Sequence, residues 1–202
     1  MKRLLLASLA LTAPLAAQGP ALGLLGGLTS SKVAISGGGA SLTLDSRIGF
    51  AVGASLRHPL SQAFDLEIDA LYAQKGFKLE VEDESGELKL GYLEVPVLLS
   101  YGIGYGSSLQ PFLLGGVSVA FKAGCSVGGT SAGVSLDLDC DEVLGTDQES
   151  MDLGLTYGAG LRFERFSVQA RYTMGMMTIT HDEDDEVTSK NRTWYLLGGV
   201  SF

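Results

Sequence analysis

The sequence predicts an all-β fold, an eight-stranded antiparallel up-and-down β-barrel of the transmembrane type. Three observations support this prediction. Apolar and polar residues alternate with period two in several segments, the connections between the segments are alternately long and short, and a leader with the features of a secretion signal stands in front of them. Each segment is long enough to cross a bilayer as a tilted strand.

The leader has the order of a secretory signal peptide. Lys2 and Arg3 are basic, and the apolar stretch that follows ends in small residues at Ala17. This stretch is too short to cross a bilayer as a helix. We therefore expect residues 1–17 to be a signal peptide and residues 18–202 to form the barrel domain of an exported protein.

The period-two alternation is clearest between residues 166 and 176. There Phe, Val, Ala, Tyr and Met side chains occupy one face, and Ser, Gln, Arg, Thr and Gly occupy the other. The same pattern predicts eight strands near residues 21–32, 47–57, 64–73, 88–101, 110–122, 152–163, 166–176 and 191–202. The count is even, so both chain ends are expected on the periplasmic side of an outer membrane.

The connections differ in length and charge. The short ones are 58–63, 102–109 and 164–165, and the mostly longer ones are 33–46, 80–87, 123–150 and 181–190. The longer group holds seventeen of the 23 acidic residues and only one of the 14 basic residues. We expect tight periplasmic turns and acidic loops outside the cell. Nucleic acid is excluded as a partner of such loops, because phosphates require cationic groups.

The polar faces of the strands combine glycine with charged side chains. A soluble lipocalin-like barrel would enclose the apolar face, whereas a membrane barrel turns that face toward lipid. The abundance of glycine on the polar face favours the membrane barrel, because a narrow eight-strand interior has little room. The charge network expected to fill and neutralise the lumen consists of Arg57, Glu67, Asp69, Glu94, Arg162 and Arg171. Within it, Glu94 and Arg171 fall on the inward face and could pair there, with Tyr92 nearby.

The last strand ends on an aromatic residue. Trp194 and the terminal Phe202 lie on one apolar face, and this pattern resembles the signal that barrel-assembly machinery recognises in its clients. We expect that machinery and outer-membrane lipid to be partners of the chain, which is expected to be a monomer.

The only two cysteines, Cys125 and Cys140, fall in one predicted loop. In an oxidising compartment this spacing predicts a disulfide. A two-cysteine metal site is the alternative, and it lacks nearby histidine partners.

Several short motifs resemble the PorT-like outer-membrane β-barrel domain family. They are Gly23-Leu-Leu-Gly-Gly-Leu, Tyr72-Ala-Gln-Lys-Gly, Tyr92-Leu-Glu-Val-Pro-Val, Arg171-Tyr, Asn191-Arg and the terminal Phe202. The segment that begins at Tyr92 is the most specific of these. The resemblance implies a barrel in the outer membrane and no particular activity. Within this segment Pro96 has no amide donor, so we expect a bulge or irregular pairing there.

The sequence offers little for catalysis or cofactor binding. His58 and His181 are the only histidines and are expected at opposite ends of the barrel, so no enzyme and no cofactor are predicted. The acidic runs 181–186 and 137–141 would suit Ca²⁺, but solvated loops are the favoured interpretation. The predicted function is a structural role, or an interaction of the acidic loops with an external ligand, in a barrel whose interior is largely filled. The alternative is a porin-like passive channel or transporter for small solutes.

Overall fold

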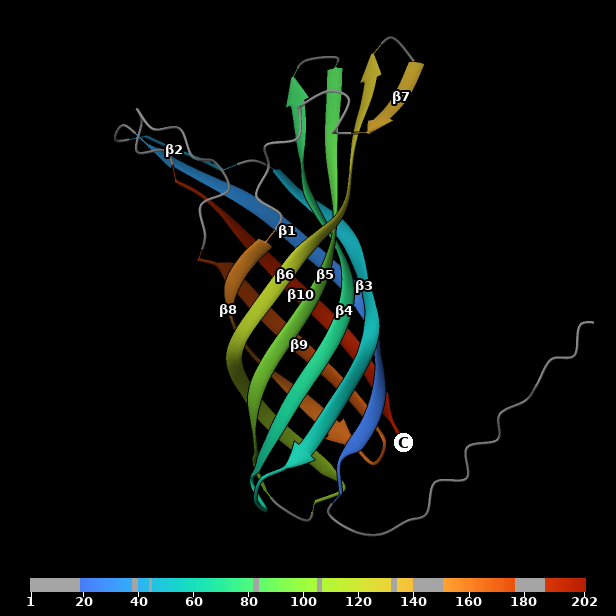
Figure 1. Cartoon of the computed structure of the whole chain (residues 1–202), viewed down its shortest axis with the longest axis vertical. Helices are drawn as coiled ribbons and strands as arrows, with labels where there is room; N and C mark the ends of the chain where they lie inside the picture. The colour runs from blue at the N-terminus through green and yellow to red at the C-terminus, as the bar shows by residue number, and fades with distance from the viewer. Residues whose placement is uncertain are drawn as a thin grey trace, which may run out of the picture.

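The computed structural model describes residues 19–37, 40–43, 45–81, 84–104, 107–131, 134–139, 151–176 and 188–202. In these ranges the chain forms one antiparallel sheet that curls into a barrel (Figure 1). The strands are β1 (Ala21–Gly37), β2 (Ala40–Thr43), β3 (Asp45–Pro59), β4 (Phe64–Val81), β5 (Glu84–Gly102), β6 (Leu109–Ser131), β7 (Val134–Asp139), β8 (Met151–Phe163), β9 (Phe166–Gly175) and β10 (Thr188–Ser201). Within the described residues, eight of them form the ring, in the order β1, β3, β4, β5, β6, β8, β9 and β10. The predicted fold class is confirmed.

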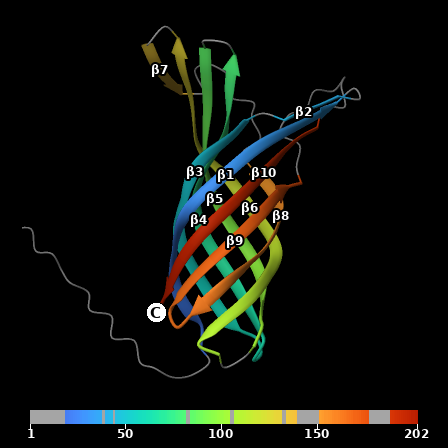
Figure 2. The ribbon, with the colours of Figure 1, turned by 180° about the vertical axis from the view of Figure 1, so that it is seen from behind.

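The ring closes through β1 and β10, which lie side by side in Figure 2. Their antiparallel register runs from Gly23 opposite Ser201 to Ser36 opposite Thr188. The first and last strands therefore satisfy each other's backbone hydrogen bonds. Closure of this kind is what a sheet requires in hydrocarbon, where no water is available to solvate an open edge.

The apolar face of the strands points outward. On β3, Ile48, Phe50 and Val52 are exposed to 70%, 44% and 52% of their surface, and the neighbouring strands continue this apolar surface. The polar face points into the barrel, where Arg171 and Glu94 are buried. Apolar side chains therefore cover the outside and charged side chains are enclosed, as expected for a membrane barrel.

One end of the barrel carries the short turns (Figure 1). Residues 60–63 connect β3 to β4, and the pair 164–165 connects β8 to β9. Glu164 adopts a left-handed backbone conformation with φ of 51°, which allows the two-residue reversal. The chain also ends at this side of the barrel, where the amide of Phe202 donates to the carbonyl of Leu22 at 2.8 Å.

The segments predicted as long loops are partly strand. Hairpin pairing of β4 with β5 continues from Gln74 opposite Gly91 to Val81 opposite Glu84. Beyond Gly124, β6 stays paired with β5, and β7 adds to its other edge. We call residues 74–81, 84–91, 124–131 and 134–139 the β4–β7 ribbon, which rises from the barrel end opposite the turns (Figure 1). At about 3.3 Å per residue, its eight-residue arms are roughly 25 Å long.

A second hairpin extends from the same end of the barrel. β2 pairs with the last residues of β1, from Ala34 opposite Thr43 to Gly37 opposite Ala40. The predicted loops 33–46, 80–87 and 123–150 are therefore shorter than expected. Their polar and glycine-rich composition indicates loops. However, the β-ladder of hydrogen bonds continues past the apolar band, and there both faces of a strand can be polar.

Of the two expectations for Pro96, irregular pairing is present and a bulge is not. The register between β4 and β5 is the same on both sides of it, although the ladder skips the pairs of Asp69 and Ala70. The register shift of β5 lies instead between Gly91 and Tyr92. The missing amide of Pro96 therefore interrupts the hydrogen-bond ladder between β4 and β5, but neither strand gains an extra residue there. At Gly91 a Cβ would lie 2.8 Å from the Tyr72 hydroxyl, so a side chain at this position would displace the Tyr72 ring.

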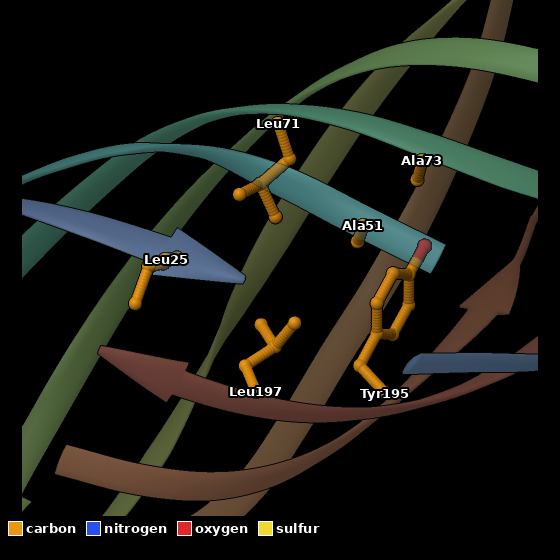
Figure 3. Packing of buried hydrophobic residues seen from close by; sticks show 6 residues of the cluster. All are labelled: Leu25, Ala51, Leu71, Ala73, Tyr195 and Leu197. Carbon is orange, nitrogen blue, oxygen red and sulfur yellow. The ribbon is translucent and has the colours of Figure 1, made fainter. Parts of the chain in front are cut away.

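The middle of the barrel is filled by side chains. Six residues from four strands converge in the lumen (Figure 3), namely Leu25, Ala51, Leu71, Ala73, Tyr195 and Leu197. A second cluster, made of Leu98, Phe112 and Leu114, fills the part of the lumen nearer the turns. An eight-strand barrel has just enough room for such side chains.

Candidate functional site

Arg171 on β9 is the centre of the first buried ion-pair group. Its Nη2 lies 2.5 Å from Oε1 of Glu67, and its Nη1 lies 2.6 Å from Oδ2 of Asp69. Glu67 and Asp69 are two residues apart on β4 and therefore point to the same face. The side chain of Arg171 is 1% exposed, so one guanidinium holds two carboxylates across the lumen away from water.

Glu94 on β5 is the centre of the second group. One carboxylate oxygen pairs with the ammonium group of Lys75, and the other accepts a hydrogen bond of 2.8 Å from the Tyr195 hydroxyl. The ammonium group of Lys75 also lies 4.9 Å from the centre of the Tyr92 ring. The expected pairing of Glu94 with Arg171 was therefore wrong, because each has other partners.

Lys75 is the member of the lumen that the sequence prediction missed. The third strand was expected to end at residue 73, whereas β4 continues to Val81. If the alternation is extended from Asp69, position 75 falls on the inward face. The signal that places Lys75 in the lumen is therefore present in the sequence, and it depends on a correct strand end.

The charges of this lumen balance. Among the described residues, six charged side chains are buried, namely Arg47, Glu67, Asp69, Lys75, Glu94 and Arg171. Three are cations and three are carboxylates, so their formal charges cancel. Arg47 joins the second group, since its Nη1 donates to the carbonyl of Lys75 at 3.5 Å. A buried charge costs several kcal/mol unless it is paired, so a neutral set is the arrangement that folding can tolerate.

The remaining two residues of the predicted network, Arg57 and Arg162, lie at the turn end and are half-buried. Nη1 of Arg162 is 3.4 Å from Oδ2 of Asp65 and 3.4 Å from Oε1 of Gln110. Its guanidinium lies 4.6 Å from the centre of the Phe112 ring. These residues face a cavity of about 610 Å³ between the short turns.

The lumen is closed just above that cavity. Beside Arg162, Glu67 and Gln169, the free volume falls to about 10 Å³. This is roughly the space of one water molecule. The side chains of Phe112 and Leu98 are 2% and 0% exposed at this part of the barrel. The described strands therefore leave no wide aqueous path at this level.

The aromatic residues of the predicted assembly signal lie on the outer face. Trp194 is 55% exposed and its ring centre is 4.9 Å from that of Tyr172, which in turn is 5.4 Å from Tyr157. Phe202 is 49% exposed at the opposite end of the same strand. These positions suit the interfacial aromatic belts of a membrane barrel. Recognition by assembly machinery stays a prediction.

Other predicted sites fall partly outside the described residues. Cys125 lies on β6 beside the cluster of Leu90, Tyr92 and Ala120, while Cys140 is outside the described ranges, so the disulfide stays a prediction. The acidic run 181–186 and the predicted signal peptide, residues 1–17, are outside as well, and of 137–141 only the backbone of 137–139 is described. In the described ranges no three His, Cys, Asp or Glu residues gather as they would around a metal ion.

A closed barrel with an apolar outer band and a charged, enclosed lumen defines the class of outer-membrane β-barrel proteins. Residues 16–181 match the family described as outer membrane protein beta-barrel domain, and the chain belongs to that family. The protein therefore resides in the bacterial outer membrane. No curated protein matches the chain. In the described ranges no helix is long and apolar enough to cross a membrane.

Several solved structures are similar to this chain. The attachment invasion locus protein Ail of Yersinia pestis is 20% identical, with 92% of this chain and 100% of that chain covered and a TM-score of 0.48. OprG from Pseudomonas aeruginosa is 15% identical, with 92% and 97% covered and a TM-score of 0.48. Neisserial surface protein A is 12% identical, with 91% and 99% covered and a TM-score of 0.47. The outer membrane enzyme PagL is also similar, at 18% identity and a TM-score of 0.44. At these values the similarities carry no argument about function.

Proposed function

We propose that this protein is a closed, non-conducting barrel that anchors the β4–β7 ribbon at the membrane and acts through that ribbon and the adjoining loops. The observation that carries the proposal is the neutral set of ion pairs across the lumen. Arg171 reaches from β9 to Glu67 and Asp69 on β4, and Glu94 on β5 meets Lys75 and Tyr195. Such paired charges, together with Leu98 and Phe112, occupy the space that a solute would need.

The proposed orientation puts the short turns and both chain ends in the periplasm and the ribbon outside the cell. Barrels of this class have short periplasmic turns and longer external connections. Within the family, we place the chain in the PorT-like branch, as an exported monomer without catalytic activity and with a disulfide between Cys125 and Cys140. Outer-membrane fractionation followed by surface proteolysis tests the orientation. Cleavage within residues 140–150 on intact cells supports it, and protection of that segment until the cells are opened contradicts it.

A passive channel is the competing function, and conductance distinguishes the two. We expect the refolded protein to give no sustained single-channel steps in a planar bilayer. A variant that lacks residues 124–149 is the matched control, because it removes much of the ribbon and leaves the lumen residues in place. It should also be silent. Steps in the intact protein would refute a closed barrel, and steps only in the deletion variant would show that the ribbon covers an open lumen.

The same deletion tests the interaction role. Cells that carry the full chain and cells that carry the variant without residues 124–149 are compared for binding to immobilised extracellular surfaces. Equal amounts of folded barrel in the two strains, measured by heat-modifiable migration on a gel, are the control. Reduced binding of the variant supports the ribbon as the working part. Equal binding on every surface on which the full chain binds contradicts it.

A further inference from the structure

The cavity at the turn end of the barrel has an unusual lining. Its volume is about 610 Å³, within the range of small-molecule sites. It is bordered by the turn residues 60–63 and by four polar side chains that project from the strands, namely Arg57, Asp65, Gln110 and Arg162. Two of these are cationic and one is anionic, so the cavity carries an excess of positive charge.

The two guanidinium groups have donors to spare. Within the described part of the chain, the side chain of Arg57 makes no hydrogen bond and no ion pair. Arg162 has two contacts of 3.4 Å through Nη1, while its buried Nε has no hydrogen-bond partner there. Both side chains therefore carry N–H donors that no described residue accepts.

The position of Arg162 is also fixed. Its guanidinium lies over the Phe112 ring at 4.6 Å, and the side chain is mostly buried. This contact and the two contacts of Nη1 limit the movement of the guanidinium. Arg57, on β3, borders the same cavity from another strand. The two guanidinium groups, of Arg57 and Arg162, repel each other, and an anion bound between them would offset this repulsion.

We propose that this cavity is a binding site for the oxyanion of a small solute, a carboxylate or a phosphate, held between Arg57 and Arg162. Guanidinium groups match both oxyanions because two parallel N–H donors face two oxygens. Gln110 offers a further donor through its side-chain amide. The site is separated from the other end of the barrel by Phe112 and the ion pairs above it, so it is a blind pocket and serves no passage.

Titration calorimetry on the protein refolded in detergent tests this site, with citrate and inorganic phosphate as separate probes. We expect saturable binding of at least one of them, and the stronger one identifies the preferred oxyanion. Arg57→Gln should weaken that binding at least tenfold, since a charge-assisted bidentate contact is lost. Arg57→Lys keeps the charge without the planar pair of donors. Its affinity for the oxyanion should lie between that of the parent protein and that of Arg57→Gln.

Arg165→Gln is the matched control. It removes one positive charge from the same end of the barrel, but Arg165 is exposed in the β8–β9 turn and does not border the cavity. The affinity of this variant should stay within twofold of the parent protein. Arg57→Gln should also remain folded, because the half-buried side chain of Arg57 makes no hydrogen bond or ion pair with the described residues, and the substitution leaves its backbone pairing in place. The proposal is refuted if neither probe binds at millimolar concentration, or if Arg57→Gln and Arg165→Gln weaken binding equally.

Discussion

Replacing Arg171 with Met removes the cation that holds Glu67 and Asp69. Met keeps much of the side-chain volume, so the change affects charge far more than packing. Both carboxylates are at most 6% exposed, and within the described residues each is held by Arg171, at 2.5 Å and 2.6 Å. Removing one partner of a buried ion pair typically costs 3–5 kcal/mol, so we expect the free energy of unfolding to fall by about 3–5 kcal/mol.

Reversible urea unfolding in lipid vesicles, followed by tryptophan fluorescence, measures this loss. Two variants serve as controls. Arg165→Met removes an exposed arginine and should change the free energy by less than about 0.5 kcal/mol. The triple variant that adds Glu67→Gln and Asp69→Asn removes the unpaired charges and should recover most of the loss. A decrease of less than about 1 kcal/mol for Arg171→Met, or no recovery in the triple variant, would refute the view that charge pairing stabilises this lumen.

Three further predictions concern other parts of the barrel. Lys75→Met should lower the free energy of unfolding by about 3 kcal/mol in the same urea assay, because it leaves a buried carboxylate without its cation. Gly160→Ala should cost about 1–3 kcal/mol, since its Cβ would lie 2.5 Å from the Phe112 ring, whereas Gly26→Ala, with open space around it, should cost nothing measurable. Peptide mapping without reductant should link Cys125 to Cys140, and two alkylatable thiols would contradict this.

Much of the barrel could be predicted from alternation alone. The face of each residue follows from its position in a period of two, which assigns Phe50 and Trp194 to the outside and Asp69 and Arg171 to the inside, as the structure has them. The tight turns could also be predicted from the sequence. A two-residue reversal such as 164–165 breaks the period-two alternation only briefly between two strands.

Partners across the lumen could not be predicted in this way. Alternation gives the face of a residue but not its level along the barrel axis, which depends on strand tilt and on the stagger of the whole ring. Arg171 therefore meets Asp69 rather than Glu94, and no local pattern indicates it. The strand ends were predicted wrongly for another reason. Above the apolar band both faces of a strand meet water, so composition no longer marks where β4 or β6 stops.

Trp194 offers the most direct test of which face meets lipid, because it is the only tryptophan of the chain and lies on the apolar outer surface. The measurement is quenching of its fluorescence in vesicles that contain lipids brominated on the acyl chain, compared with quenching by iodide in the surrounding water. We expect strong quenching by the brominated lipids and little by iodide. Efficient iodide quenching with no effect of the brominated lipids would mean that this face is not in the membrane.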